Sequence, residues 1–132
     1  MSKEVKMCII IRGDLKNTKG EKIRSGKVAA QVGHGVLGFV WDKLKGKKIN
    51  FELSDEEYSW YINGQTKIAL KVGSEKELVE IFKAAKTAGL TAHIITDAGH
   101  TEFDGVATKT VVAIGPNYSE NIDKITSHLS LY

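Results

Sequence analysis

The sequence predicts an α/β fold in which helices cover both faces of a mostly parallel or mixed β-sheet. Two patterns support this: apolar, β-branched runs alternate with segments of helical periodicity, and capping residues stand at the starts of several helices. Strands that alternate with helices form layered sheets of this kind. With 132 residues, 42% of them hydrophobic and 27% charged, the chain is long enough for one domain with its own core.

Four segments are predicted to be strands. Residues 5–11 (VKMCIII) form an almost continuous apolar run, which is typical of a strand buried on both faces. The next two strands are predicted at residues 66–72 and 91–96. The last is predicted at residues 109–114, where Gly115-Pro116 ends the run because proline cannot donate a backbone hydrogen bond.

Four helices are predicted between and after these strands. The first covers residues 25–44, with Ser25 as its cap and Lys45-Gly46 at its end. Two more begin with a serine followed three residues later by a glutamate, the pattern of a capping box. These helices cover residues 54–61 and 74–89, and the last helix covers residues 119–129.

The only cysteine, Cys8, lies within the first apolar run. No internal disulfide can form, so we expect a buried core thiol and a reducing compartment. The sequence shows neither a signal-peptide h-region nor an apolar run of about 18 residues, so a cytoplasmic chain without a membrane span is expected. The histidines lack H-x-x-x-H spacing and a lone cysteine excludes a zinc ribbon, so no metal is expected.

Basic residues cluster in two segments, although the formal net charge is only +3. One interpretation is a pair of solvated, lysine-rich loops. The other is a surface for a polyanion, because clustered lysines neutralise phosphates whatever the base sequence. The first cluster holds Lys16, Lys19, Lys22 and Arg24, and the second holds Lys43, Lys45, Lys47 and Lys48.

The Gly26-Lys27 pair invites comparison with a phosphate-binding loop. A Walker A loop has four residues between its first glycine and the Gly-Lys pair, and a Ser or Thr follows the lysine. Here five residues separate Gly20 from Gly26, and Val28 follows Lys27. No G-x-G-x-x-G follows the first strand either, so the sequence argues against both a nucleotide hydrolase and a dinucleotide-binding domain.

A polar stripe runs along the first predicted helix. At about 100° per residue, Lys27, Gln31, His34 and Gly38 fall within about 60° of one another. The stripe is either the solvent face of an amphipathic helix or a functional surface. Lys27 lies in the first turn, where the helix dipole disfavours a cation, so a bound anion or a lowered lysine pKa would account for its position.

The same helix is rich in small residues. Gly33 and Gly35 would each cost about 1 kcal/mol relative to alanine inside a helix. Such a cost indicates that a neighbouring element or a ligand comes close to the helix backbone.

Polar residues follow the predicted strands at their carboxyl ends, where sites form in sheets of this class. Arg12-Gly13-Asp14 follows the first strand, and Asp97-Ala98-Gly99-His100-Thr101 follows the third. The second group is either a simple Asx turn or a site in which Asp97 lies near Lys27, a pair that shifts pKa values and positions water. His100, Thr101 and Thr108 would add hydrogen-bonding groups on the same rim.

Taken together, these residues resemble the type II peptidyl-tRNA hydrolases of archaea and eukaryotes, over about residues 7–132. The resemblance implies a single domain with a three-layer α/β/α sandwich, a mixed four-stranded sheet between helices, and often a dimer. It implies a carboxylic ester hydrolase that cleaves the bond between a stalled peptide and the terminal ribose of tRNA, without a metal or organic cofactor. The markers are RGDL at residues 12–15, GKVAAQVGH at 26–34, GQTK at 64–67, DAGHT at 97–101, AIGP at 113–116 and the LSLY ending.

The resemblance places the active site at Lys27, His34 and Asp97, with Thr101 and Thr108 nearby. The family usually has arginine where this chain has His100, which removes a permanent bidentate phosphate donor. Val32 and Gly35 also depart from the family pattern and are interpreted as packing variants. The substrate-binding residues expected around the site are Gln31, Arg12, Asp14, Gln65 and His100, with the basic residues Lys16, Lys19, Lys22 and Arg24.

No Ser-His-Asp pattern with a nucleophile elbow is present, so direct attack by water is favoured over an acyl-enzyme. In this hypothesis Asp97 orients or deprotonates the water, and Lys27 with the first-turn amides stabilises the oxyanion. His34 would bind substrate or shuttle a proton. A catalytically silent RNA- or protein-binding module with the same fold is the alternative.

Overall fold

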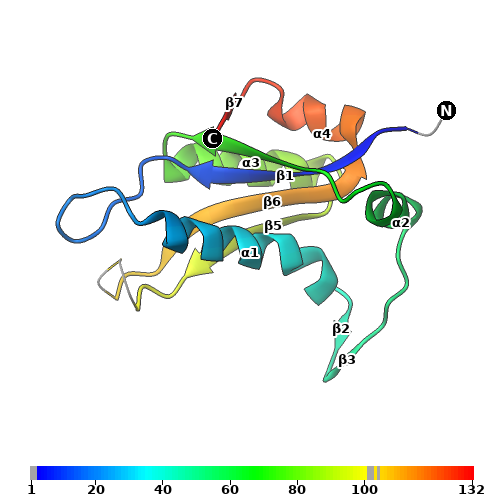
Figure 1. Ribbon diagram of the computed structural model, residues 1–132, viewed down its shortest axis with the longest axis horizontal. Helices are drawn as coiled ribbons and strands as arrows, with labels where there is room; N and C mark the ends of the chain where they lie inside the picture. The colour runs from blue at the N-terminus through cyan, green and yellow to red at the C-terminus, as the bar shows by residue number, and fades with distance from the viewer. Residues whose placement is uncertain (1–2, 101–102, 104) are drawn as a thin grey trace.

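The structure is a computed structural model that describes residues 3–100, 103 and 105–132. Over these residues a five-stranded mixed sheet has the order β5-β6-β1-β4-β7, and a separate two-stranded hairpin joins β2 to β3 (Figure 1). The elements are β1 (Val5–Arg12), α1 (Ser25–Trp41), β2 (Leu44–Lys45), β3 (Lys48–Ile49), α2 (Asp55–Ile62), β4 (Lys67–Val72), α3 (Glu75–Thr87), β5 (Ala92–Asp97), β6 (Thr108–Tyr118), α4 (Ser119–Thr126) and β7 (Ser130–Leu131).

Strand β1 lies at the centre of the sheet, parallel to β4 and antiparallel to β6. Its side chains alternate between two apolar clusters, one on each face. Ile10 belongs to the cluster that contains Leu78 of α3, whereas Ile9 belongs to the cluster that contains Phe39 of α1 and Trp60 of α2. The continuous apolar run of β1 is therefore explained by burial on both faces, as predicted.

The predicted mixed sheet is confirmed, but the predicted count of four strands is wrong for the described part of the chain, where the main sheet has five. The additional strand, β7, is only two residues long and pairs with β4 at Leu70 and Lys71. A segment that short, partly polar and exposed has no periodicity of its own. Its strand conformation comes from its neighbour, so the sequence pattern could not reveal it.

Strand β6 does not end at Gly115-Pro116 as predicted but continues to Tyr118. The β1–β6 register shifts between Lys6 and Cys8, opposite this dipeptide. A bulge of this kind accommodates a proline inside a sheet, because the residue without an N–H is left out of the regular ladder.

Several predicted helix boundaries also differ. Helix α1 ends at Trp41 instead of residue 44 because the chain turns into the β2–β3 hairpin, where Gly46 has a φ of 62°. Its N-cap is Arg24, without a side-chain cap, so Ser25 is the first helical residue and not the cap. Helix α4 ends at Thr126. The Ser54 capping box of α2 is confirmed, with both of its hydrogen bonds to Glu57 present.

The glycines of α1 allow the helix to lie close to the sheet. A Cβ at Gly35 would come within 3.2 Å of Val111 Cγ1, and a Cβ at Gly38 would lie 2.5 Å from His93 Cγ. Gly33, in contrast, has open space around it. The predicted close approach of a neighbouring element is therefore confirmed at Gly35, and it brings the inner face of α1 against β5 and β6.

Cys8 is 1% exposed, and burial raises the pKa of its thiol above the ordinary value, so the predicted buried core thiol is confirmed. Within the described ranges, no helix is both long and apolar enough to cross a membrane. The same residues contain no cluster of three or more His, Cys, Asp or Glu side chains that could hold a metal ion.

Candidate active site

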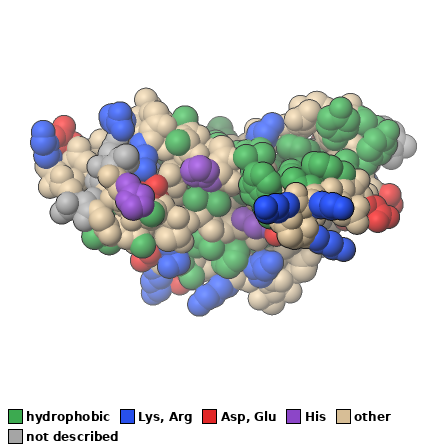
Figure 2. Space-filling view, turned by 90° about the horizontal axis from the view of Figure 1, so that it is seen from below, with side chains coloured by type: hydrophobic (Ala, Val, Ile, Leu, Met, Phe, Trp, Pro, Cys, Tyr) green, Lys and Arg blue, Asp and Glu red, His purple; other side chains and the backbone are tan. Residues whose placement is uncertain are grey.

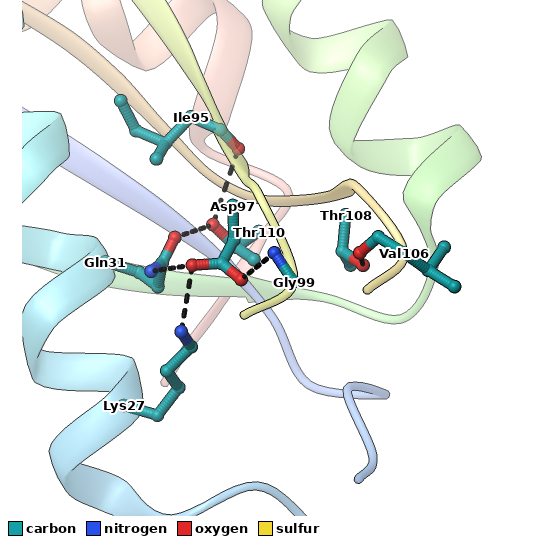
Figure 3. A network of polar contacts seen from close by, with 8 residues as sticks. All are labelled: Lys27, Gln31, Ile95, Asp97, Gly99, Val106, Thr108 and Thr110. Carbon is teal, nitrogen blue, oxygen red and sulfur yellow. Dashed lines mark hydrogen bonds and ion pairs between the residues drawn. The ribbon is translucent and has the colours of Figure 1, made fainter. Parts of the chain in front are cut away.

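The carboxyl end of β5 meets the first turns of α1, and a hydrogen-bonded network joins them (Figure 3). Asp97 is the last residue of β5, and its Oδ1 accepts hydrogen bonds from Lys27 Nζ at 2.8 Å and Gln31 Nε2 at 3.1 Å. Its Oδ2 accepts one from the Gly99 amide at 2.9 Å. The first-turn lysine and the strand-end carboxylate therefore form a direct ion pair.

This ion pair is largely withdrawn from solvent, with side chains 12% exposed for Lys27 and 13% for Asp97. Burial alone raises the pKa of Asp97. The hydrogen bond and charge of Lys27, with the bonds from the Gly99 amide and Gln31, outweigh burial and lower the pKa of Asp97 below its ordinary value. Asp97 is consequently a carboxylate at neutral pH.

Gln31 is held in a single orientation by a residue behind it. Thr110 Oγ1 donates to Gln31 Oε1 at 2.6 Å, and both residues are almost completely buried. With its carbonyl oxygen occupied in this way, the Gln31 amide must present its NH₂ group to Asp97. Gln31 therefore belongs to the buried inner face of α1, and the solvent-face interpretation of the polar stripe is wrong for this residue.

Lys27 also contacts Phe103, with its ammonium 5.7 Å from the ring centroid. Phe103 is 8% exposed and forms a small apolar cluster with Leu15 and Ile23. Sequence reasoning missed both Phe103 and Thr110. The available signals were a polar residue inside the apolar run KTVVAI and an isolated aromatic residue in a polar loop.

Several predicted site residues lie outside this network. Thr108 is paired with Asp97 in the β5–β6 register, but its Oγ1 donates to the Val106 carbonyl at 2.8 Å, and the hydroxyl that bonds Gln31 is that of Thr110. Among the described residues, His34 has no polar contact with Asp97; it lies one turn beyond Gln31 and is exposed. His100 is exposed as well, and Thr101 is outside the described residues.

Arg12 and Asp14 bind each other. The Arg12 guanidinium donates to both Asp14 carboxylate oxygens at 2.9 Å and to the Lys109 carbonyl at 3.0 Å. The bond from Arg12 lowers the pKa of Asp14 despite partial burial. Together with Phe103 and Thr108, the two residues line a surface pocket of about 290 Å³ beside the ion pair.

Comparison with known proteins decides the family. The family model described as peptidyl-tRNA hydrolase PTH2 matches residues 5–132.

The chain belongs to this family.

It is 44% identical over 127 residues to a peptidyl-tRNA hydrolase of Methanocaldococcus jannaschii, covering 96% of this chain and 99% of the relative. A peptidyl-tRNA hydrolase of Haloquadratum walsbyi is 41% identical over 97% of this chain and 100% of its own length. Human mitochondrial peptidyl-tRNA hydrolase 2 is 37% identical over 99% of this chain and 66% of its own length. The family resemblance predicted from the sequence motifs is thereby confirmed.

In this member of the PTH2 family, Gln65 does not join the other predicted site residues. It lies in the turn before β4, with a φ of 54°. Strand β4 runs parallel to β1, and its first residue, Lys67, pairs with Met7. Arg12 is at the other end of β1, where its guanidinium donates to the carbonyl of Lys109 in β6. Lys109 follows Thr108, which is paired with Asp97. Gln65 and Asp97 are therefore at opposite ends of the sheet, and we withdraw Gln65 from the candidate site.

The basic residues of the first cluster lie on the loop that leads into α1. Asn17 shapes this loop, since its side-chain oxygen accepts hydrogen bonds from the amides of Lys19 and Glu21 at 2.9 and 3.0 Å. The loop holds the exposed residues Lys16, Lys19, Lys22 and Arg24 immediately before Lys27. These four residues form a cationic rim that precedes Lys27 along the chain, and within it the Lys22 ammonium lies 6.0 Å from the centroid of the Tyr132 ring.

Proposed function

We propose that this chain hydrolyses the ester bond between a peptide and the terminal ribose of tRNA, and that Lys27 and Asp97 carry the reaction. The chain belongs to a peptidyl-tRNA hydrolase family. The observation that supports the assignment of residues is the shielded ion pair at the carboxyl end of β5, with Gln31 and the Gly99 amide on the same carboxylate.

Asp97 orients the attacking water in this proposal. Because its pKa is lowered, Asp97 is a weak base at neutral pH, which favours orientation of the water over complete removal of its proton before attack. The water oxygen bonds to the ester carbon, the bond from that carbon to the ribose oxygen breaks, and the ribose oxygen takes up the proton that the water loses.

Lys27 stabilises the negative charge that develops on the carbonyl oxygen. The backbone amides of Lys27 and Val28 already donate to the Arg24 carbonyl, at 3.0 and 3.2 Å, so we assign this role to the ammonium group and not to those amides. His34, exposed and one turn beyond Gln31, is assigned to substrate contact and not to proton transfer.

The assignment is tested by measuring kcat/KM of Lys27→Ala and Asp97→Asn on a peptidyl-tRNA. Each is expected to fall by about 100-fold or more, the loss typical of a removed transition-state contact. Lys83→Ala, an exposed lysine of α3, is the matched control. Values within about threefold of wild type for both site variants would reject the assignment. Equal activity with EDTA would agree with a reaction that needs no metal, and a trapped covalent peptidyl-enzyme would overturn direct attack by water.

We further propose that the cationic rim formed by Lys16, Lys19, Lys22 and Arg24 binds the tRNA backbone through phosphate contacts. In the second cluster, Lys43 is unsuited to this role because its ammonium binds Glu57 Oε1 and the Glu52 carbonyl, both at 3.0 Å. Higher salt should raise KM much more than it changes kcat, and triple replacement of the rim lysines by alanine should weaken this dependence. A KM independent of salt would assign these lysines to an ordinary solvated surface.

We also propose that the chain forms a homodimer, as the family resemblance implies. Figure 2 shows hydrophobic side chains gathered at one end of the molecule, beside basic ones. The exposed apolar residues of α1, the hairpin segment and α2 include Trp41, Leu44, Phe51, Tyr58 and Tyr61. Sedimentation equilibrium of wild type and Phe51→Glu tests the proposal; a wild type that sediments as a monomer at all concentrations would reject it.

A further inference from the structure

Strand β5 forms one edge of the sheet, and this edge is open. Among the described residues, no strand pairs with its outer side. The other side of the sheet is covered instead, because β7 pairs with β4 there and the Tyr132 amide donates to the Ala69 carbonyl at 3.0 Å. Figure 1 shows β5 at the lower margin of the sheet, and Figure 2 looks at the molecule from that side.

The hydrogen-bond alternation identifies the backbone groups that face outward. The Gly115 amide donates to the Thr91 carbonyl at 2.8 Å, so these two residues form a hydrogen-bonded pair of the antiparallel β5–β6 ladder. The alternation then directs the N–H and C=O groups of His93 and Ile95 toward β6, and those of Ala92 and Ile94 away from it.

The outer edge of β5 lacks two of the usual protections, although its pairing with β6 shifts register between Ile95 and Thr96. Natural edge strands carry lysine, proline or other features that prevent pairing with another chain. The segment AHIITD has neither lysine nor proline, and its β-branched residues favour strand pairing. The strand ends at Asp97, so this open edge leads to the candidate active site.

We propose that this open edge binds the peptide part of the substrate as an added strand, parallel to β5. The inference rests on the proposed function, in which the ester carbonyl lies at Asp97. That carbonyl is the carboxyl end of the peptide, and β5 also runs toward Asp97, so the two chains are parallel. Main-chain pairing suits an enzyme whose substrates differ in peptide sequence, because every peptide offers the same N–H and C=O groups.

The length of β5 sets the number of peptide residues that can bind. Its six residues, at about 3.3 Å each, extend for about 20 Å, which is enough for about six residues of an added strand. Each hydrogen bond to the edge should improve kcat/KM by about threefold to tenfold.

The test uses N-acetylated peptidyl-tRNAs with one to seven residues on the same tRNA. We expect kcat/KM to rise with length and to level off at about six residues, the reach of β5. Methylation of alternate peptide amides should lower kcat/KM by about threefold to tenfold for each lost bond, whereas methylation of the intervening amides should not. Equal kcat/KM at all lengths, or equal effects of both methylation patterns, would overturn the inference.

A pair of variants tests the protein side. Ile94→Pro removes the outward N–H, and proline is tolerated at an edge where that group faces solvent. Ile94→Ala keeps the N–H and loses most of the side chain, so it is the matched control, and thermal unfolding of both confirms folding. For each variant, kcat/KM is divided by its value for N-acetylaminoacyl-tRNA. The proline variant should lose most of the dependence of kcat/KM on peptide length, whereas the alanine variant should retain it. The same dependence in both variants would overturn the inference.

Hydrolysis of N-acetylaminoacyl-tRNA distinguishes failure of the edge-binding inference from failure of the proposed function. Wild type that cleaves it without any effect of peptide length would refute the edge-binding inference while leaving the proposed function intact. Wild type that cleaves none of the substrates would refute the proposed function and the inference together.

Discussion

Replacement of Thr110 by valine tests whether the buried network behind Asp97 orients the site. Valine has nearly the shape of threonine, so the change removes a hydroxyl without opening a large cavity. Thr110 Oγ1 lies 2.6 Å from Gln31 Oε1, and the two residues are 0% and 2% exposed. Loss of the hydroxyl leaves a buried carbonyl oxygen without this donor and lets the Gln31 amide rotate.

The burial of both partners sets the expected magnitude. An unsatisfied buried acceptor costs about 1–3 kcal/mol in the free energy of unfolding. Gln31→Met should lower the free energy of unfolding less than Thr110→Val does. In the methionine variant the Thr110 hydroxyl still has an acceptor, the Ile95 carbonyl 3.4 Å away. Without a fixed Gln31 amide, Asp97 loses one charge-assisted hydrogen bond, and kcat/KM should fall about tenfold in either variant.

The assay is urea unfolding combined with steady-state kinetics on wild type, both single variants and the double variant. Because apolar groups then replace both partners, the double variant should be more stable than the sum of the single losses predicts, while its kcat/KM stays low. Strict additivity of the two losses of stability, or full activity of Thr110→Val, would refute the reasoning.

Three further predictions follow from individual residues. The pKa of Asp97 is lower in the folded state than the unfolded value of about 3.9. The stability that its ionisation contributes is therefore complete above about pH 3.9 and is lost as the pH falls through the folded pKa. Urea unfolding between pH 2 and 6 should show that the free energy of unfolding decreases at acid pH, and that Asp97→Asn makes this decrease smaller. Gly38→Ala should destabilise the protein by about 1–3 kcal/mol because the new Cβ meets the His93 ring. Gly33→Ala places its Cβ in open space and should stabilise the protein by about 0.5–1 kcal/mol. Thermal unfolding of the two variants should therefore show shifts of opposite sign. His100→Arg should lower KM for peptidyl-tRNA by about threefold with little change in kcat, through a bidentate phosphate contact, and an unchanged KM at low salt would contradict this.

Local sequence patterns were sufficient for most of the secondary structure. The apolar run of β1 and the Ser54 capping box of α2 each depend on residues close together in the chain, and both were predicted correctly. The errors occur where partners distant in sequence decide. Strand β7 exists because β4 offers an edge, and β6 passes through Pro116 because the β1–β6 register shifts there.

The polar stripe of α1 shows the same division within the site. A helical projection gives the angles between side chains but not the direction of the sheet. Gly35 and Gly38 turn one side of the helix toward β5 and β6, which buries Gln31 and leaves His34 exposed. Neighbours on the projection are therefore separated in the structure.

The sequence by itself determined the order of the four helices and the four longer strands, the buried central strand, the Cys8 thiol and the motifs that indicate the family. Only the tertiary structure decided which polar residues meet at Asp97. It selected Gln31, 66 positions away, and linked it to Thr110, 79 positions from Gln31, while it placed Gln65 at the opposite end of the sheet. Periodicity reports on neighbours within a few residues, whereas these contacts depend on how α1 packs across the strands.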